Sequence, residues 1–584
     1  MVKIGHYYEN GQSFFRIYAP LKKNISIEID GNNKTIELNK NNDGFWIGSC
    51  PALPEGSLYY VNIDNSKTLP DPTSRYQPFG VHGLSMIVKT QPAYREDWKG
   101  ISIEQAVIYE LHLGTFTPQG NLRSATEKIP YLAELGINVI EIMPISTFPG
   151  NADWGYDGVY LFALSPSYGT YKDLELFLNK AHEYKIAVIL DVVYNHFGPE
   201  GNYTNNFAPY TKKSQTPWGA AINFDQNYSD GIREFYKCNV QWWLEDIGFD
   251  GMRLDAWAMI EDEKKPNIRR EITDLAHDIG KRNHRKIIMI AEHLRNDPSV
   301  VSSDGDNCDA QWIDDFGLSI RSFLTKDPLD KLLKSFYLFD DIIKALKQAV
   351  VLDGTRMNHA LNSYTGKSPI NVKPSQNVVY IQNHDMIGNR VRGDRFVTTS
   401  NNDNFEKSLL AAFTLFSSNF RPLIFMGEEF ASSSPFPFFE SFTDNYLIKA
   451  VKEGRKSEWK FTGIEPFDSH AQETLELAHL KWNELSVDKN IRNFNIYSRL
   501  IRLKIKNIIG YDSYVMKGKL ENTVVIKNST SLTLLNFNQN NAEFEYDDRF
   551  EVLLDNSNKN KPFKLGPYGA QILIDKNQNI DLEF

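Results

Sequence analysis

Residues 186–193 read IAVILDVV, five apolar residues followed by an aspartate and two valines. A nearly continuous apolar run of this length, rich in β-branched residues, is typical of a parallel strand that is buried on both faces of a sheet. The preceding segment, 171–184, has the i, i+3, i+4, i+7 spacing of a helix with one buried face. The residues on that face are Leu174, Phe177, Leu178 and Ala181. A helix therefore leads into a buried strand here.

The same pairing of a short apolar run with a helical pattern recurs from about residue 105 to residue 490. There are eight such runs: 106-AVIYELHL-113, 137-INVIEIMP-144, 186-IAVILDVV-193, 251-GMRLDA-256, 287-IIMIAE-292, 309-DAQWIDDF-316, 377-NVVYIQNHD-385 and 421-RPLIFMGEE-429. Eight units in one segment predict an α/β fold, the (β/α)8 or TIM barrel. An open doubly wound sheet is the alternative, but no G-x-G-x-x-G fingerprint follows an early strand.

The segments on either side of the barrel have a different pattern. Residues 1–95 contain short alternating stretches separated by turn-rich segments, which predicts a β-sandwich of the carbohydrate-binding-like kind. Residues 505–584 return to short β runs and predict a C-terminal antiparallel β domain. The catalytic barrel is then assigned to residues 96–504. Within it, 194–230 is rich in Gly, Pro and Asn without periodicity, which predicts a long functional loop after the third strand.

Composition excludes several classes of protein. The net charge of −10 argues against a nucleic-acid or anionic-membrane partner, because binding phosphates requires clustered positive charge. The three cysteines are far apart and odd in number, so they suggest neither a disulfide framework nor a zinc site. The polar start and the lack of an apolar run of about 20 residues predict a cytoplasmic protein without a membrane span. These features predict no oligomeric state.

Polar residues stand at the carboxyl ends of four of the predicted strands. The third ends in 191-DVVYNH-196, the fourth in 251-GMRLDA-256, the fifth in Ala291 and Glu292, and the seventh in 382-QNHD-385. Each acidic residue by itself could be a helix cap or part of a solvated loop. However, the carboxyl ends of all eight strands meet at one mouth of the barrel, where the active site of this fold lies. Together these residues therefore predict one site.

Two carboxylates across a small gap are what cleavage of a glycosidic bond requires. Asp255 and Arg253 are two residues apart on one strand, so their side chains lie on the same face. The positive charge of Arg253 favours the ionised form of Asp255, which a nucleophile needs. Glu292 follows the apolar run IIMIA, and such surroundings raise the pKa of a carboxyl group, as a proton donor requires. Asp385, beside His384, is placed to hold the hydroxyls of the distorted sugar ring.

With these residues in place, the sequence resembles the α-amylase superfamily. The segments DVVYNH, GMRLDA, AE and NHD match the four hallmark segments of that superfamily in order and in strand position. The resemblance implies that Asp255 is the nucleophile, Glu292 the acid/base and Asp385 the transition-state stabiliser. It also implies that Arg253, His196 and His384 surround the reacting sugar and that Tyr156, in 154-WGYDG-158, stacks on it.

A finer resemblance covers nearly the whole chain. Segments including 109-YELHLGTFTPQG-120, 380-YIQNHDMIGNRVRGDR-395 and 426-MGEEF-430 are similar to those of the malto-oligosyltrehalose trehalohydrolases. This implies that a malto-oligosyltrehalose, an α-glucan, is hydrolysed at the α-1,4 bond next to its trehalose end, with net retention of configuration. Two positions depart from the family pattern: Met386 replaces a glutamine, and Gly317 with Leu318 replaces a pair of histidines.

Two further residues are predicted to contact the glucan: His112, at the end of the first strand, and Trp218, in the long loop. For His112 a structural hydrogen bond under the mouth is the alternative, and for Trp218 it is core packing. Asn195 matches a calcium ligand of many amylases, but a calcium cage needs six to eight oxygen ligands and no complete set is found. No metal and no cofactor are therefore predicted.

Two other functions fit parts of the pattern. A glycogen branching or debranching enzyme would share the N-terminal module and the barrel. A non-catalytic amylase-like binding protein would be expected to lack at least one of the three carboxylates or Arg253, and all four are present. Hydrolysis that releases trehalose remains the main hypothesis.

Overall fold

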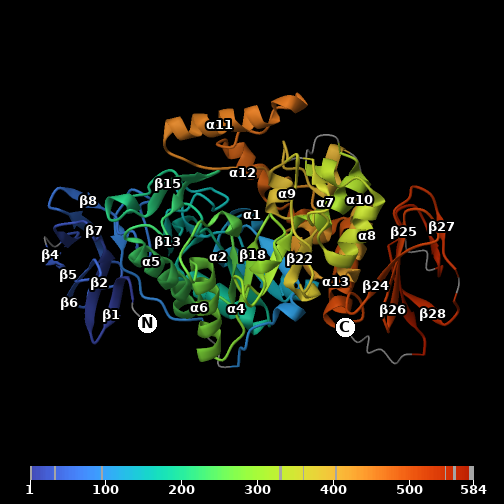
Figure 1. The fold of residues 1–584 in the computed structure, drawn as a ribbon, viewed down its shortest axis with the longest axis horizontal. Coiled ribbons are helices and arrows are strands. Elements are labelled where there is room, and N and C mark those ends of the chain that lie inside the picture. Colours follow the sequence, from blue (N-terminus) through green and yellow to red (C-terminus); the bar gives the residue numbers. More distant parts are fainter. Residues whose placement is uncertain are drawn as a thin grey trace.

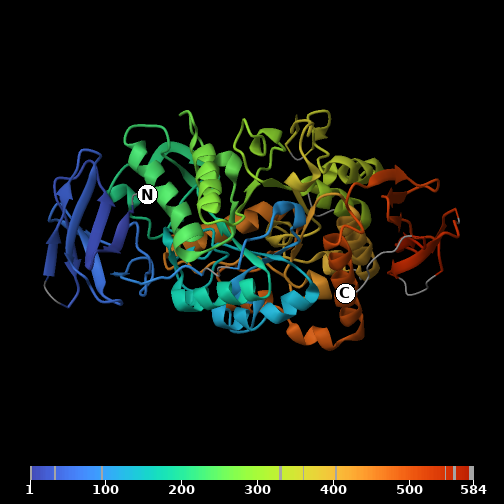
Figure 2. The same ribbon diagram turned by 90° about the horizontal axis from the view of Figure 1, so that it is seen from below.

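The computed structural model describes residues 3–31, 34–93, 97–327, 332–359, 361–401, 404–545, 547–556 and 561–577. Along its longest axis the molecule has three parts (Figure 1): an N-terminal β part at one end, a central α/β part, and a C-terminal β part at the other end. Seen from below (Figure 2), the two β parts lie on opposite sides of the central part.

Eight parallel strands form the closed barrel of the central part. In barrel order they are β10 (Ile108–Leu111), β11 (Val139–Ile142), β14 (Ala187–Val192), β17 (Gly251–Leu254), β18 (Ile288–Glu292), β19 (Ala310–Ile313), β22 (Asn377–Tyr380) and β23 (Arg421–Phe425). The barrel closes where β23 pairs with β10. Each strand lies within one of the eight apolar runs, so the predicted barrel fold is confirmed.

Helices surround the barrel because each has an apolar face to bury. On α4 the buried residues include the four predicted from the spacing, and Thr170 with Asp173 forms a capping box at its start. The helices are α1 (Leu113–Phe116), α2 (Leu122–Thr126), α3 (Ile129–Leu135), α4 (Tyr171–Glu183), α5 (Ser229–Gln241), α6 (Ile268–Arg282), α7 (Asp314–Thr325), α8 (Phe339–Gln348), α9 (His384–Gly388), α10 (Phe405–Ser417), α11 (Asn445–Trp459), α12 (Gln472–Ala478) and α13 (Asp488–Ile505). A π-helical turn, Trp242–Ile247, extends α5.

The N-terminal part is a sandwich of two antiparallel sheets, as the alternating stretches predict. One sheet has the order β1-β2-β6-β5 and the other β4-β3-β7-β8, with β9 paired to β7. Their bounds are β1 (Gly5–Glu9), β2 (Gln12–Tyr18), β3 (Ile25–Ile29), β4 (Lys34–Glu37), β5 (Asn39–Lys40), β6 (Phe45–Pro51), β7 (Leu58–Ile63), β8 (Lys67–Leu69) and β9 (Ser85–Met86). Apolar residues of both sheets, such as Phe15 and Val61, are fully buried between them.

The C-terminal part is a five-stranded antiparallel sheet with the order β24-β25-β26-β30-β28, beside the short pair β27-β29. The bounds are β24 (Tyr514–Lys517), β25 (Thr523–Lys527), β26 (Ser531–Asn536), β27 (Ala542–Glu543), β28 (Phe550–Asp555), β29 (Lys564–Leu565) and β30 (Ala570–Asp575). Of the two domain boundaries, residues 95 and 96 lie outside the described residues. At the other, α13 ends at Ile505, and the boundary at 504/505 stays a prediction.

One segment differs from what the sequence pattern predicts. The stretch 194–230, expected to be an irregular loop, contains the hairpin of β15 (Thr211–Thr216) and β16 (Gly219–Ile222). Its strand β15 is TKKSQT, which lacks the apolar alternation of a half-buried strand because none of its residues is buried. In addition, α11 lies on top of the barrel (Figure 1), with Trp459 as its single buried residue. Among the described residues, no helix is both long and apolar enough to cross a bilayer.

The sandwich packs directly on α5 of the barrel. The Tyr18 hydroxyl donates to the backbone oxygen of Tyr228 at 2.8 Å, and Arg16 Nη1 lies 2.8 Å from Glu234 Oε1. Gly231 lies under the Tyr18 ring, where a side-chain methyl would overlap the ring carbons. This contact ties the N-terminal part to the barrel and depends on the absence of a side chain at residue 231.

We therefore expect Gly231→Ala to destabilise the protein by about 1–3 kcal/mol, because overpacking forces Tyr18 from its position. Gly454→Ala is the matched control: Gly454 is exposed on α11 with open space around it, so alanine should stabilise the helix by about 0.5–1 kcal/mol. Thermal unfolding of the two variants measures the difference. Equal melting temperatures would contradict the proposed packing.

Candidate active site

A buried guanidinium occupies the centre of the barrel mouth. Arg253, on β17, is fully buried, and its Nη1 lies 2.9 Å from Asp191 Oδ2 and 2.8 Å from Asp255 Oδ1. Its Nη2 lies 2.8 Å from Glu292 Oε2. Asp191 and Arg253 are register partners on neighbouring strands, which brings their side chains together. One cation therefore holds three carboxylates, two of which are the predicted nucleophile and acid.

Glu292 ends β18 and is nearly buried. Besides Arg253 it has the backbone N–H of Ala256 as a partner, which donates to Oε2 at 2.8 Å. Ala256 has a φ of 40°, in the left-handed region, and this turn after Asp255 directs the N–H toward Glu292. Burial raises the pKa of Glu292 to about 8; Arg253 acts to lower it, while the charges of Asp255 and Asp385 raise it further. Glu292 is thus protonated at neutral pH.

Asp385 begins α9 and is the most open of the three carboxylates, with a side chain 40% exposed. Its Oδ2 lies 3.5 Å from His384 Nε2, and Asn389 Nδ2 donates to its Oδ1 at 3.0 Å. His384 Nδ1 lies 2.5 Å from Glu110 Oε1 on β10. Burial lowers the pKa of His384, but the charges of Asp385 and Glu110 outweigh it and raise the pKa to about 9. His384 is therefore a cation beside Asp385.

Aromatic rings form the wall of the mouth next to these charges. Tyr156 stacks on the His384 ring at 5.1 Å, and its hydroxyl donates to Asp191 Oδ2 at 2.7 Å. His196 Nε2 lies 3.1 Å from the Tyr156 backbone oxygen, and its ring stacks on Trp218 at 5.7 Å. Trp218, on the turn between β15 and β16, is 48% exposed, which excludes core packing. A flat apolar surface thus extends outward from the carboxylates.

The geometry does not support the predicted glucan contact of His112. The residue is buried, with Nδ1 3.0 Å from Thr115 Oγ1 and Nε2 2.9 Å from the Asp153 backbone oxygen. The Tyr168 hydroxyl lies 3.2 Å from the same Nε2. Both ring nitrogens are occupied, so the structural alternative fits better. The physical reason is burial: His112 directly follows β10, and its ring packs among Tyr168, Phe436 and Phe439.

Three polar residues of the site, Asp191, Glu110 and Glu141, were not singled out from the sequence, and Asn195 was considered there only as a calcium ligand. Asp191 and Asn195 lie in the quoted segment DVVYNH; Asn195 Nδ2 donates to Asp255 Oδ2 at 2.8 Å. Glu110 and Glu141 are register partners on β10 and β11. Burial raises the pKa of Glu141 well above its usual range, and the charges of Glu110 and Asp191 act in the same direction. A carboxyl group inside an otherwise apolar strand, as in YELHL and VIEI, is the signal that could have identified both glutamates.

Gly317 and Met386, two positions that depart from the family pattern, lie next to each other in the structure. A methyl group on Gly317, at the start of α7, would approach the Met386 Cε at 3.3 Å and would also collide with the backbone oxygen of Tyr380. Met386 directly follows Asp385 and is half-buried. The replaced polar positions therefore lie side by side next to the mouth.

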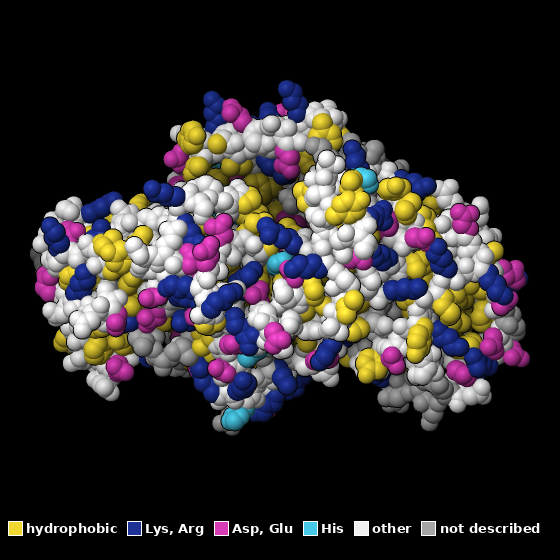
Figure 3. All heavy atoms as spheres, viewed as in Figure 1, with side chains coloured by type: hydrophobic (Ala, Val, Ile, Leu, Met, Phe, Trp, Pro, Cys, Tyr) yellow, Lys and Arg dark blue, Asp and Glu magenta, His cyan; other side chains and the backbone are white. Residues whose placement is uncertain are grey.

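The described residues contain no group of three or more His, Cys, Asp and Glu side chains arranged to hold a metal ion. The mouth opens toward α11, whose Arg455 Nη2 donates to the backbone oxygen of Gly388 at 3.2 Å. The space-filling view shows a hollow under α11, with hydrophobic and acidic side chains inside it (Figure 3). The site is thus an acidic, aromatic-lined hollow, which suits a neutral polyhydroxyl ligand.

Comparison with known proteins agrees with this chemistry. The family model of the alpha amylase catalytic domain matches residues 89–222. The malto-oligosyltrehalose trehalohydrolase of Saccharolobus solfataricus is 39% identical over 496 residues, 84% of each chain. The protein of the same name from a Rhizobium species is 35% identical over 514 residues, 85% of each chain. A crystal structure titled putative alpha amylase, from Salmonella typhimurium, superposes with a TM-score of 0.89 at 30% identity, covering 98% of this chain and 100% of that one.

A (β/α)8 barrel with these carboxylates at its mouth, together with the matched catalytic domain, defines a glycoside hydrolase of the α-amylase superfamily. Within that superfamily the chain belongs to the malto-oligosyltrehalose trehalohydrolase family, because its relatives match it along most of both chains. Both resemblances drawn from the sequence are confirmed. An oligosaccharide substrate follows from the class.

The pair of Glu110 and His384 gives a testable pH dependence. The charge of Glu110 helps to raise the pKa of His384 to about 9, so Glu110→Gln should move that pKa toward the ordinary 6.5. Because the folded-state pKa is raised, protonated His384 stabilises the fold at low pH, and this contribution is lost as pH rises through about 9. In the variant the loss should occur at lower pH. NMR titration of 15N-histidine-labelled protein measures the shift.

Glu37→Gln, at an exposed position on β4, is the control and should leave the titration of His384 unchanged. If His384 had the same pKa in the Glu110→Gln protein, then Glu110 would not be what keeps His384 protonated.

Proposed function

We propose that this enzyme hydrolyses the α-1,4 bond next to the trehalose end of malto-oligosyltrehalose, with retention of configuration, and releases trehalose. The observation that carries the proposal is the Arg253 guanidinium, which has one terminal nitrogen 2.8 Å from Asp255 and the other 2.8 Å from Glu292. The two carboxyl groups therefore lie side by side. That arrangement fits the spacing of about 5–5.5 Å in retaining enzymes better than the roughly 6.5–9.5 Å that leaves room for a water in inverting ones.

Asp255 is assigned as the nucleophile. Its carboxylate is oriented by Arg253 Nη1, 2.8 Å from Oδ1, and by Asn195 Nδ2, 2.8 Å from Oδ2, and its side chain keeps 12% of its surface exposed. It attacks the anomeric carbon of the sugar on the non-trehalose side of the bond. The bond from that carbon to the 4-oxygen of trehalose breaks as the ester with Asp255 forms.

Glu292 is assigned as the acid and then the base. Its pKa of about 8 means that at neutral pH it carries the proton that the departing trehalose oxygen requires. The resulting Glu292 carboxylate then takes a proton from water. The hydroxide so formed attacks the anomeric carbon and releases Asp255, which restores both groups and the original configuration.

Asp385 is assigned to the hydroxyls of the distorted ring. It is open to the mouth, and the cationic His384 beside it keeps a positive charge near its outer oxygen. Tyr156, stacked on His384, offers its ring to the apolar face of the same sugar. Trp218, at the rim, is suited to stack on a neighbouring glucose unit. The trehalose end would lie near Met386, whose apolar side chain replaces a hydrogen-bonding one.

Removing the nucleophile should abolish turnover while preserving the fold. We expect Asp255→Asn to lower kcat by more than about 1000-fold, because an amide cannot form the ester intermediate. Asn is isosteric and can still accept a hydrogen bond from Arg253, so the melting temperature should change little. A variant with substantial remaining activity would remove Asp255 from this role.

The pKa of Glu292 predicts the alkaline limb of the pH profile. The proton donor exists below the pKa of about 8, so kcat/KM should fall as pH rises through about 8. Glu292→Gln should lower the rate by roughly 100- to 10,000-fold and remove this limb. Rates measured from pH 5 to pH 10 test both statements. A wild-type rate independent of pH between 7 and 9 would contradict the assignment.

Product analysis tests the substrate. Maltotriosyltrehalose should yield trehalose and maltotriose, whereas maltotetraose, which lacks the trehalose end, should be cleaved much more slowly. Transfer of chains without new reducing ends would instead indicate a branching enzyme. Equal rates on the two substrates would contradict recognition of the trehalose end.

A further inference from the structure

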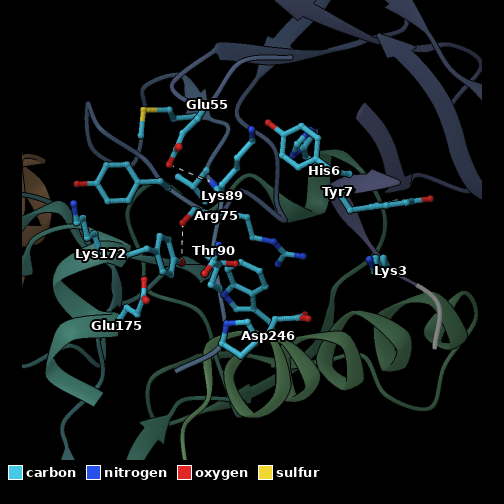
Figure 4. A pocket seen from close by; sticks show the side chains of 18 of the residues that line it. Lys3, His6, Tyr7, Glu55, Arg75, Lys89, Thr90, Lys172, Glu175 and Asp246 are labelled. Atoms are coloured by element: carbon cyan, nitrogen blue, oxygen red, sulfur yellow. Dashed lines mark hydrogen bonds between the residues drawn. The ribbon is translucent and has the colours of Figure 1, made fainter. Parts of the chain in front are cut away.

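A second cavity, of about 1150 Å³, lies between the N-terminal sandwich and the barrel. Figure 4 shows it between strand β1, with Tyr7, and the barrel helices that carry Lys172, Glu175 and Asp246. None of the predicted active-site residues lines it. We call this cavity the interdomain groove. Its volume is slightly above the roughly 300–1,000 Å³ of typical small-molecule sites.

Arg75 lines this groove and has hydrogen-bond donors without a partner. The residue is 91% buried (9% exposed), and its guanidinium lies between the rings of Phe162 and Trp242, at 4.3 Å and 4.2 Å. Its Nη2 donates to the Ile4 backbone oxygen at 2.9 Å. Its Nε and Nη1 are buried without a hydrogen-bond partner. Because an unsatisfied buried donor is costly, this edge of the guanidinium calls for an acceptor from a bound molecule.

A buried acceptor lies on the same wall. Gln241, the last residue of α5, also lines the groove, and its Oε1 has no hydrogen-bond partner. Residues with unused donors and with an unused acceptor therefore line one space, which suits a ligand whose groups both give and receive hydrogen bonds. Sugar hydroxyls do both, whereas an ionised carboxylate only accepts.

The charges around the groove are mixed in sign, which disfavours a strongly charged ligand. The basic and acidic residues on its lining, apart from Arg75, are Lys3, Lys89, Lys172, Glu55, Glu175 and Asp246. They balance, so an anion drawn to Arg75 would also meet three carboxylates. Aromatic rings complete the lining: Tyr7 and Tyr76 are both half-buried, so part of each ring stays accessible. Flat rings among paired donors and acceptors suit the apolar faces and hydroxyls of sugars.

We propose that the interdomain groove is a second carbohydrate site that binds a segment of linear α-1,4-glucan, with Arg75 and Gln241 contacting its hydroxyls. The choice of glucan rests on the proposed function, because the substrate is the sugar chain that this enzyme meets. The site would hold part of a long chain on the sandwich side of the barrel while the chain end is cleaved at the mouth.

The test uses the slow Glu292→Gln protein, so that little of the ligand is consumed during the measurement. Calorimetric titration with maltoheptaose should show two binding sites. Adding Arg75→Met, which keeps an apolar side chain between Phe162 and Trp242 but removes the donors, should weaken the groove site by roughly tenfold or more. Gln241→Leu removes the unpaired oxygen, so it should fold at least as well and should weaken the same site.

Tyr511→Ala is the control, because Tyr511 is exposed near the C-terminal sheet and outside both sites. It should leave both binding sites unchanged. Slower hydrogen exchange of residues 3–8 and 238–246 with maltoheptaose bound would place the second site in the groove. If Arg75→Met fails to fold, the titration of Gln241→Leu with maltoheptaose tests the proposal by itself.

A single site in the parent protein, or two sites unchanged by the folded groove variants, would overturn the proposal. Binding of inorganic phosphate that is lost in Arg75→Met, without a second maltoheptaose site, would overturn it in favour of an anion site. The product assay on maltotriosyltrehalose is a separate measurement. Trehalose can be released by a protein whose groove binds no glucan, and the groove can bind glucan in a protein that releases no trehalose.

Discussion

The charge of Arg253 is the constraint on which the rest of the mouth depends. A fully buried guanidinium is tolerated only if acidic groups lie close to it, and Asp191, Asp255 and Glu292 do so, all within 3.0 Å. The same contacts fix where the two reacting carboxyl groups can be. Because three carboxyl groups share one cation, the electrostatics that stabilise the barrel mouth also position its chemistry.

A second group of charges, centred on His384, balances the excess negative charge around Arg253. Three carboxylates around one cation leave an excess of negative charge, which is increased by Glu110 and Asp385. Protonated His384 offsets part of this negative charge, because it lies 2.5 Å from Glu110 and 3.5 Å from Asp385. Burial shifts the remaining excess toward protonation at Glu141 and Glu292. The division of labour between an ionised and a protonated carboxyl group thus follows from the balance of the whole cluster.

Much of this could be predicted from the sequence because the barrel imposes a simple rule. Every strand contributes its carboxyl end to one mouth, so Asp255, Glu292 and Asp385 could be grouped without knowing a single distance. Glu110 and Glu141 could not be grouped in the same way, since they lie within strands and their importance depends on which residues face them across the sheet. The hairpin β15–β16 was missed because β15 is polar and β16 is only four residues long, so neither makes an alternating apolar pattern, yet the hairpin places Trp218 at the rim.

The sequence by itself determined the eight-strand barrel, the flanking β parts and the three carboxyl groups, because hydrophobic periodicity and strand-end position are local properties of the chain. Only the tertiary structure decided which nitrogen of Arg253 meets which carboxylate, that both nitrogens of His112 are occupied beneath the mouth, and that Arg75 faces a groove with unused donors. These features depend on which side chains the folded chain brings together: Arg253 meets Glu292 across neighbouring strands, His112 meets Asp153, and Arg75 lies between Phe162 and Trp242.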